Sequence, residues 1–122
     1  MKDLGIVIVN WNTRDYLCRC LQTVYASEGD FSYDVVVVDN GSTDGSAEMV
    51  TETFPQVTLI SGHGNVGYPR GNNLGLRWLG YADTPGEMRA DVPRYALLLN
   101  PDTELPPRAL ADMIAYMDAH PE

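Results

Sequence analysis

Acidic side chains stand in this sequence at the places where short apolar runs end. Asp39 closes a run of four valines, and Asp102 follows the apolar stretch at residues 95–99 within the tripeptide Asn-Pro-Asp. A carboxylate placed like Asp39 could accept a hydrogen bond from a ribose hydroxyl or a base N–H. A carboxylate placed like Asp102 could hold Mg²⁺ or Mn²⁺, hard cations that take one or two protein carboxylates together with phosphate oxygens. These residue types suggest a site for a nucleotide diphosphate.

Each of these acids also has a purely structural interpretation. Asp39 could open the tight turn at residues 39–42, since Asp and Asn favour such positions. Asp102 or Thr103 could cap a following helix. We favour a ligand contact for Asp39, because the ends of parallel strands face the crevice where ligands bind. For Asp102 the pentapeptide at residues 100–104 leaves both interpretations open.

A glycine-rich segment at residues 62–67 offers further candidates. It has the composition of a phosphate cradle but matches neither the P-loop nor the GxGxxG fingerprint. His63 lies between two glycines, and we favour an exposed loop residue over a catalytic base. Trp11 could stack on a base or cover the edge of a sheet. Side chains that could contact a nucleotide or its phosphates are Asn65, Arg70, Asn72 and Asn73.

The elements that would position these residues alternate between strand and helix patterns. Runs rich in β-branched residues predict buried strands at residues 4–9, 34–38, 57–60 and 95–99. Right-handed crossovers between them give an α/β fold, a Rossmann-like and mainly parallel sheet flanked by helices. Ligands bind beyond the carboxyl ends of such strands. The strands run there into Asn10, Asp39, the glycine-rich segment and Asn100, which predicts one polar site.

Helical spacing of apolar residues predicts a helix after each strand. We expect Thr13 to cap the first helix and Ser42 or Thr43 to cap the second. Residues 61–71 should be loop, and residues 81–93 an exposed excursion. The last helix should begin near Pro106 and Pro107. The expected buried faces are Leu17, Cys20, Leu21 and Val24; Ala47, Val50 and Phe54; Leu74 and Trp78; and Leu110, Met113, Ile114 and Met117.

Composition limits the class of protein. The 122 residues are 44% hydrophobic, which suits a single domain with one core. A formal net charge of −9 makes nucleic acid a poor partner, because a polyphosphate repels that charge. Cys18 and Cys20 point apart on a helix, so we expect free thiols in a reducing compartment. No stretch approaches the ~20 apolar residues of a membrane span and no signal sequence is present, so we expect a cytoplasmic location.

Four segments in order resemble family 2 glycosyltransferases of the GT-A fold, and most resemble the rhamnosyltransferase-like branch. The segments are residues 6–12, 37–46, 65–75 and 98–104. The resemblance covers nearly the whole chain, and four motifs in the right order are more specific than any one alone. It implies binding of a nucleotide-diphosphate sugar and inverting transfer of that sugar to an acceptor hydroxyl, in cell-wall or polysaccharide biosynthesis.

The resemblance also implies roles for individual residues. Trp11 and Asn12 would line the nucleobase pocket, and Asp39 would contact the base. The segment at residues 65–75 would flank the nucleoside. Residues 100–102 take the place of the Asp-x-Asp motif, so that Asp102 would coordinate Mg²⁺ or Mn²⁺. The full set of expected donor-binding residues is Asn10, Trp11, Asn12, Asp39, Asn40, Gly67, Arg70, Asn73, Asn100, Pro101 and Asp102.

The sequence departs from the family pattern in two respects. Asn100 replaces the first acid of the Asp-x-Asp motif, a form found in the rhamnosyltransferase-like branch, which implies a dTDP or UDP sugar. Family members also continue beyond Glu122 with the acceptor site and the catalytic base. We therefore expect residues 1–122 to be the donor-binding, N-terminal part of a longer enzyme, inactive alone. The exposed face left by a missing half could promote homodimerisation.

Two other readings remain open. The chain could be a nucleotide-sugar-binding module without catalytic competence, or another nucleotide-binding α/β domain such as a nucleotidyltransferase. A basic, glycine-rich nucleotidyl-transfer loop near the N-terminus is absent, which disfavours the latter. For a complete glycosyltransferase the resemblance implies a carbohydrate or lipid-linked glycan acceptor. It also implies a cytoplasmic location that could be peripheral at the inner face of the membrane.

Overall fold

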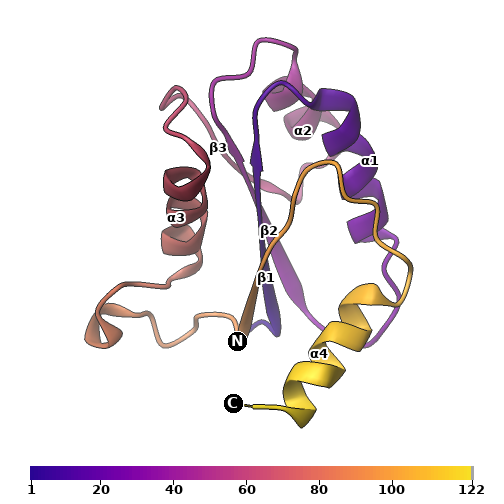
Figure 1. Cartoon of the computed structure of the whole chain (residues 1–122), viewed down its shortest axis with the longest axis vertical. Helices are drawn as coiled ribbons and strands as arrows, with labels where there is room; N and C mark the ends of the chain where they lie inside the picture. The colour runs from indigo at the N-terminus through magenta and orange to yellow at the C-terminus, as the bar shows by residue number, and fades with distance from the viewer. Residues whose placement is uncertain (122) are drawn as a thin grey trace.

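The computed structural model describes residues 1–121, apart from the side chain of Pro85; Glu122, the last residue of the predicted domain, lies outside the described residues. Strands and helices alternate along the chain, as predicted (Figure 1). The strands are β1 (Leu4–Asn10), β2 (Tyr33–Asp39), β3 (Thr58–Ile60) and β4 (Tyr95–Leu98). The helices are α1 (Arg14–Tyr25), α2 (Ser46–Thr53), α3 (Tyr68–Leu79), the short 3₁₀ helix η1 (Pro85–Glu87) and α4 (Ala109–Ala119).

The four strands form one parallel sheet in the order β3-β2-β1-β4, which confirms the predicted α/β fold. The register aligns Asn10 with Asp39 and Val7 with Leu98. Helices α1, α2 and α4 lie on one side of the sheet and α3 on the other (Figure 1). The chain turns from β1 to β2 and β3 on one side, whereas β4 lies on the other side of β1. The strand order therefore switches at the carboxyl ends of β1 and β4, where ligands bind in sheets of this kind.

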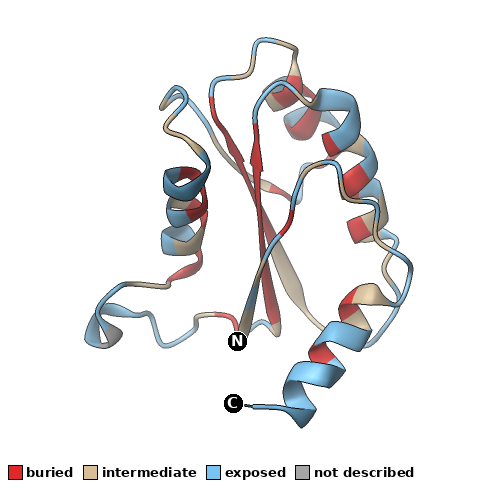
Figure 2. Ribbon diagram, in the orientation of Figure 1, coloured by how far each residue is buried: buried red, intermediate tan, exposed pale blue. Residues whose placement is uncertain are grey.

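The two central strands form the core. Every residue of β1 is buried, as are the last five residues of β2 (Figure 2). Side chains of alternate residues point to opposite faces of a sheet, and here they feed two clusters. Ile6, Ile8 and Val37 join the larger cluster, which contains the buried face of α1. Val7, Val9 and Val38 join the smaller cluster beneath α3. The predicted inward face of α1 is confirmed, since Leu17, Cys20, Leu21 and Val24 are all buried.

Helix α3 packs on the sheet through glycines, which sequence periodicity did not predict. Its buried residues are Gly71, Asn72, Gly75 and Leu79. The predicted inward position of Trp78 is wrong, because 45% of this residue is exposed. Without side chains at Gly71 and Gly75 the helix approaches Val7 and Val9 closely, and that face sets the helix rotation. The loop predicted at residues 61–71 also ends sooner, because Pro69 is tolerated in the first helical turn.

We expect Gly75→Val to destabilise the fold by about 1–3 kcal/mol, the usual cost of forcing extra atoms into a packed core. A Cβ at Gly75 would lie 2.5 Å from Cγ1 and 3.3 Å from Cβ of Val7, so a change of rotamer at Val7 cannot relieve the contact. Urea denaturation would measure the free energy of unfolding. Asn73→Val, at an exposed position of the same helix, is the matched control. Equal stability of the two variants would show that the sheet yields at this point.

Two other helices differ in detail from the predictions. In α2 the buried residues are Ser46, Met49 and Val50, while Ala47 is only half-buried and Phe54 is buried just beyond the helix. Helix α4 begins at Ala109, after the two prolines, and buries Leu110 and Ile114. The predicted burial of Met113 and Met117 is wrong, since 39% and 43% of these residues are exposed. Both residues line an apolar groove of about 500 Å³ between α4 and β4, the last strand at that side of the sheet.

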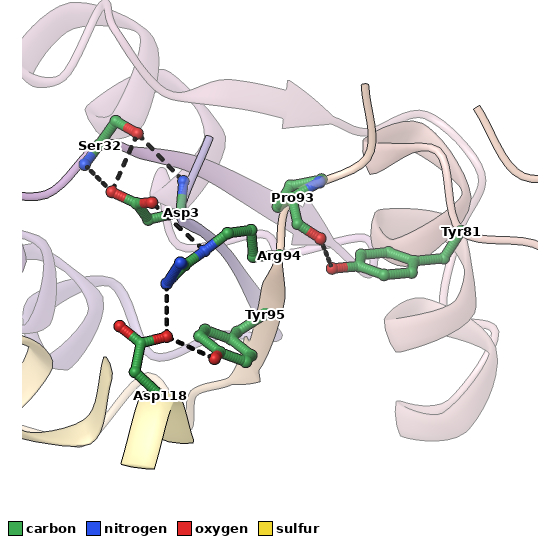
Figure 3. A network of polar contacts seen from close by, with 7 residues as sticks. All are labelled: Asp3, Ser32, Tyr81, Pro93, Arg94, Tyr95 and Asp118. Atoms are coloured by element: carbon green, nitrogen blue, oxygen red, sulfur yellow. Dashed lines mark hydrogen bonds and ion pairs between the residues drawn. The ribbon is translucent and has the colours of Figure 1, made fainter. Parts of the chain in front are cut away.

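A polar network fastens the amino end of the sheet to α4 (Figure 3). Arg94 lies 3.4 Å from Asp3 and 2.7 Å from Asp118 on α4. The hydroxyl of Tyr95 donates to Asp118 over 2.6 Å, and this hydrogen bond raises the pKa of Tyr95. Ser32 extends the network, since its backbone N–H donates to Asp3. These contacts all lie at the amino ends of the strands, whereas the candidate site residues follow the carboxyl ends.

The remaining predictions about the chain can be stated briefly. Residues 81–93 form the expected excursion, largely exposed, with the Tyr81 hydroxyl donating to the carbonyl of Pro93 over 2.6 Å (Figure 3). Cys18 and Cys20 are free thiols, as predicted. Within the described residues, no helix has the length and apolar character needed to cross a membrane.

Candidate functional site

The carboxyl ends of β1 and β2 meet in a buried polar cluster around Asp39. Only 3% of Asp39 is exposed, and Asn10 is fully buried beside it. The side-chain amide of Asn10 donates to Oδ1 of Asp39 over 3.1 Å. Ser42 donates to the same carboxylate twice, from its hydroxyl over 2.7 Å and from its backbone N–H over 3.0 Å. The turn contacts considered for Asp39 are therefore present, and they hold its carboxylate in a fixed orientation at the sheet edge.

Ser42 also ties the loop after β1 to the loop after β2. Its hydroxyl accepts from the backbone N–H of Asn12 over 2.9 Å, while the Asn12 side chain accepts from the backbone N–H of Thr43 over 2.8 Å. Asn12 takes a positive φ of 52°, a conformation that Asn adopts more readily than most residues. Trp11 lies between these anchored neighbours, and 55% of this residue is exposed.

The prediction that Ser42 or Thr43 caps α2 is wrong, because both residues instead form hydrogen bonds with Asn12 in the loop after β1. Gly45 occupies the N-cap position, and the side chain of Asp44 accepts from the backbone N–H of Ser46 over 3.1 Å. Asp44 also accepts from the backbone N–H of Arg14, the first residue of α1, over 3.0 Å. Thr13 is the N-cap of α1 by position, but its hydroxyl donates to Asn10 instead. One carboxylate thus serves the amino ends of two helices, which carry partial positive charge.

The hydrogen bonds to Asp44 predict a dependence of stability on pH. Partial burial alone would raise the pKa of Asp44, but hydrogen bonds from the Ser46 side chain and from backbone N–H groups outweigh it and lower the pKa. A carboxyl group with a lower pKa in the folded state stabilises the fold above its unfolded pKa, and that contribution disappears as the pH falls through the folded value. We expect the melting temperature to fall less steeply in Asp44→Asn than in the wild type between about pH 5 and pH 2. Parallel curves in thermal melts would contradict this role.

Asn40 connects β2 to the glycine-rich segment and to the start of α3. It is buried, its amide nitrogen donates to the carbonyl of Gly67 over 3.2 Å, and its oxygen lies 2.9 Å from Nε2 of His63. The prediction of an exposed His63 is therefore wrong: the residue is half-buried and holds the loop against β2. Gly67, the N-cap of α3, has φ 84° and ψ 167°, a backbone conformation essentially restricted to glycine.

Residues 100–102 form a turn at the end of β4. The carbonyl of Asn100 accepts from the backbone N–H of Thr103 over 3.0 Å. Asp102 is exposed, and because α4 begins only at Ala109, neither Asp102 nor Thr103 caps that helix. Burial, together with the negative charge of nearby Asp102, raises the pKa of the Cys20 thiol to about 11. Capping of α4 by Asp102 is thereby excluded, whereas the turn is present and leaves Asp102 exposed.

Two further candidates lie apart from this cluster. Arg70 and Asn73 are exposed on α3 and line a shallow hollow of about 350 Å³ with Val66, Leu74 and Arg77. Among the described residues, no hydrogen bond or ion pair links them to Asp39 or Asp102. Asn72 is buried, and within the described chain its side-chain oxygen has no hydrogen-bond partner. Sequence reasoning gave no separate role to Asp44 and Tyr68 and considered Ser42 only as a helix cap, although the short Asp-x-x-Ser spacing is a signal for a side-chain turn.

The donor atoms of the site suit a cation that is shared with a ligand. Within the described residues, no three His, Cys, Asp or Glu side chains come together as a metal site. A hard divalent cation bound with a nucleotide diphosphate needs only one or two protein carboxylates, because phosphate oxygens and water complete its shell. The exposed carboxylate of Asp102 fits that requirement, whereas Asp39 is already occupied by protein donors.

A curated protein is similar to the chain over most of its residues. The chain is 31% identical over 109 residues to N-acetylglucosaminyl-diphospho-decaprenol L-rhamnosyltransferase of Mycobacterium tuberculosis, covering 88% of this chain and 34% of that protein. The chain thus spans about a third of the length of this relative.

Solved structures share the fold at lower identity. TarS of S. aureus in complex with UDP-GlcNAc aligns with a TM-score of 0.75 and 23% identity, over 98% of this chain and 32% of that one. The mannosyltransferase PcManGT of Pyrobaculum calidifontis, in complex with GDP-Man and Mn²⁺, aligns with a TM-score of 0.73 and 22% identity, over 95% and 32%. The family model described as "Glycosyl transferase family 2" matches residues 5–122, and the chain accordingly belongs to glycosyl transferase family 2.

Proposed function

We propose that this chain binds the nucleotide-diphosphate sugar donor of a glycosyltransferase, at the carboxyl ends of β1, β2 and β4. The observation that carries the proposal is the cluster of Asn10, Asp39 and Ser42 at the carboxyl ends of β1 and β2, with the exposed Asp102 following the neighbouring strand β4. The strand order switches there, between β1 and β4. Polar ligands bind in such a crevice in open parallel sheets.

In this proposal the nucleoside lies against the loops after β1 and β2. Trp11 offers an exposed aromatic face for a base. Asp39 and Asn12 are held rigidly by the Ser42 link, and a second acceptor lone pair on the Asp39 carboxylate can receive a base N–H. Asn40 and Gly67 fix the glycine-rich segment that closes the other wall. A uracil or thymine nucleotide is our proposed ligand, and the UDP-GlcNAc complex of TarS supports the uracil form.

The diphosphate would lie at the end of β4. We propose that Asp102 holds Mg²⁺ or Mn²⁺ together with the phosphate oxygens, which the Mn²⁺ complex of PcManGT supports. Such a cation offsets the negative charge of a diphosphate leaving group. A net charge of −9 makes that neutralisation necessary, because the chain as a whole repels a diphosphate.

The complete reaction would be an inverting transfer of the sugar, a rhamnosyl or hexosyl group, to an acceptor hydroxyl. The name of the mycobacterial relative, which acts on a diphospho-decaprenol sugar, supports a lipid-linked glycan acceptor. A carboxylate elsewhere in the enzyme would take the acceptor proton. We propose that residues 1–122 form the donor-binding part, and we expect no measurable transfer by these residues alone. Appreciable transfer in a product assay would overturn that expectation.

Isothermal titration calorimetry tests the donor site directly. With Mn²⁺ present, we expect UDP or dTDP to bind to the 122-residue chain in a saturable, one-to-one manner. ADP, in which the larger purine replaces the pyrimidine, is the comparison ligand and should bind more weakly. Absence of binding by both UDP and dTDP would refute the proposed function.

A further inference from the structure

A side-chain contact joins the start of α3 to the end of β4. Tyr68 is the first residue of α3, and its hydroxyl donates to Oδ1 of Asn100 over 3.4 Å. The two residues are 32 positions apart in sequence, and both are exposed. The contact therefore links the start of the helix to the turn that carries Asp102.

Both partners of this contact are anchored by their backbones. The carbonyl of Gly67, directly before Tyr68, accepts from the buried side chain of Asn40. The carbonyl of Asn100 accepts from Thr103 over 3.0 Å and lies 3.8 Å from the sulfur of Cys20. Because these anchors hold the two main chains, the position of the Tyr68 hydroxyl selects the orientation of the Asn100 amide.

The orientation of that amide decides what Asn100 can do. Its oxygen is the only atom of the side chain that could ligate a cation, and Tyr68 donates to it. The amide nitrogen has no protein partner among the described residues, and an amide NH₂ group can only donate. Phosphate oxygens accept such hydrogen bonds, whereas a divalent cation requires an oxygen ligand.

We propose that Tyr68 is a positioning residue that holds the oxygen of Asn100, so that the Asn100 amide nitrogen donates to the diphosphate of the donor. The proposal rests on the proposed function and assigns the neutral residue of the Asn-Pro-Asp turn to the phosphates. The metal is then left to Asp102. An acid at position 100 would repel the phosphates unless a cation lay between the two groups. The neutral amide of Asn100 causes no such repulsion.

The test is a double-mutant cycle on UDP binding in Mn²⁺, with Tyr68→Phe, Asn100→Ala and the double variant. We expect Tyr68→Phe to weaken UDP binding about three- to tenfold, the usual effect of one hydrogen bond. At saturating UDP, the Mn²⁺ concentration for half-maximal binding should not change, because the amide is not a metal ligand. In the Asn100→Ala background, Tyr68→Phe should have an effect of less than about twofold, because the group it positions is gone.

Tyr116→Phe is the matched control, since Tyr116 is exposed on α4 at the other end of the sheet. The inference is overturned if Tyr68→Phe binds UDP like Tyr116→Phe, if its effect is the same in both backgrounds, or if it shifts the Mn²⁺ requirement. In each of these cases the wild type still binds UDP and the proposed function stands. If the wild type does not bind UDP or dTDP, the proposed function fails and this inference fails with it.

Discussion

Asp39→Ala is expected to lower the free energy of unfolding by about 2–4 kcal/mol, because it leaves several buried donors without an acceptor. The carboxylate accepts from the amide of Asn10 and from both the hydroxyl and the backbone N–H of Ser42. Asn10 is fully buried, so water cannot replace the lost partner without opening the sheet edge. Urea denaturation followed by circular dichroism would measure the loss.

In the same variant, we expect UDP binding to weaken by more than the loss of stability explains. Loss of Asp39 releases the link between the loops after β1 and β2, which positions Trp11 and Asn12. Asp39→Asn keeps the volume but offers one acceptor atom fewer, and we expect it to lose less stability than Asp39→Ala. Asp30→Ala, at an exposed position, is the control for removal of a negative charge. If Asp39→Ala were as stable as Asp30→Ala, the buried cluster would not be the anchor of the site.

Asp102→Ala should have the opposite profile, with a large loss of binding and little change in stability. We expect UDP binding in Mn²⁺ to weaken at least about tenfold, because removal of even an outer-shell partner of a metal costs that much. Asp102 is exposed and makes no structural hydrogen bond among the described residues, so its removal should change stability by less than about 0.5 kcal/mol. Calorimetry with and without Mn²⁺ would separate the two effects.

Glu104→Ala provides the matched control for Asp102. It removes one negative charge from an exposed position two residues further along the chain. Equal loss of UDP binding in the two variants would mean that general charge, and no specific ligand at position 102, governs metal-dependent binding. Retention of full Mn²⁺ dependence in Asp102→Ala would remove Asp102 from the proposed metal site.

Much of the fold could be predicted because it follows from runs of residues that are close in sequence. Composition predicted the valine-rich strands, and the spacing of apolar residues predicted the inward face of α1. The strand-end rule then selected Asn10, Asp39 and Asn100 as neighbours along one edge of the sheet. The register of β1 with β2 confirms the adjacency of Asn10 and Asp39.

What could not be predicted depends on contacts between distant segments. Apolar spacing predicted Trp78 as an inward residue, but the close approach at Gly75 sets the rotation of α3, and a missing side chain gives no hydrophobic signal. Ser42 is a plausible helix cap by sequence, but in the structure its hydroxyl donates to Asp39 and accepts from the backbone N–H of Asn12. Met113 follows a helical apolar stripe, yet within that stripe only Leu110 and Ile114 are buried. In each case a partner far along the chain decides between locally equivalent roles.

Residue-resolved NMR would test most directly whether Asp39 and Asp102 belong to one nucleotide site. We expect UDP to shift the amide resonances of Asn12, Asp39 and Asn40, with a small amount of Mn²⁺ broadening those next to Asp102 most strongly. Shifts at the β1 and β2 ends together with broadening at the β4 turn are the predicted result. Perturbations centred instead on Asp34 and Asp91, at the opposite end of the sheet, would contradict the account.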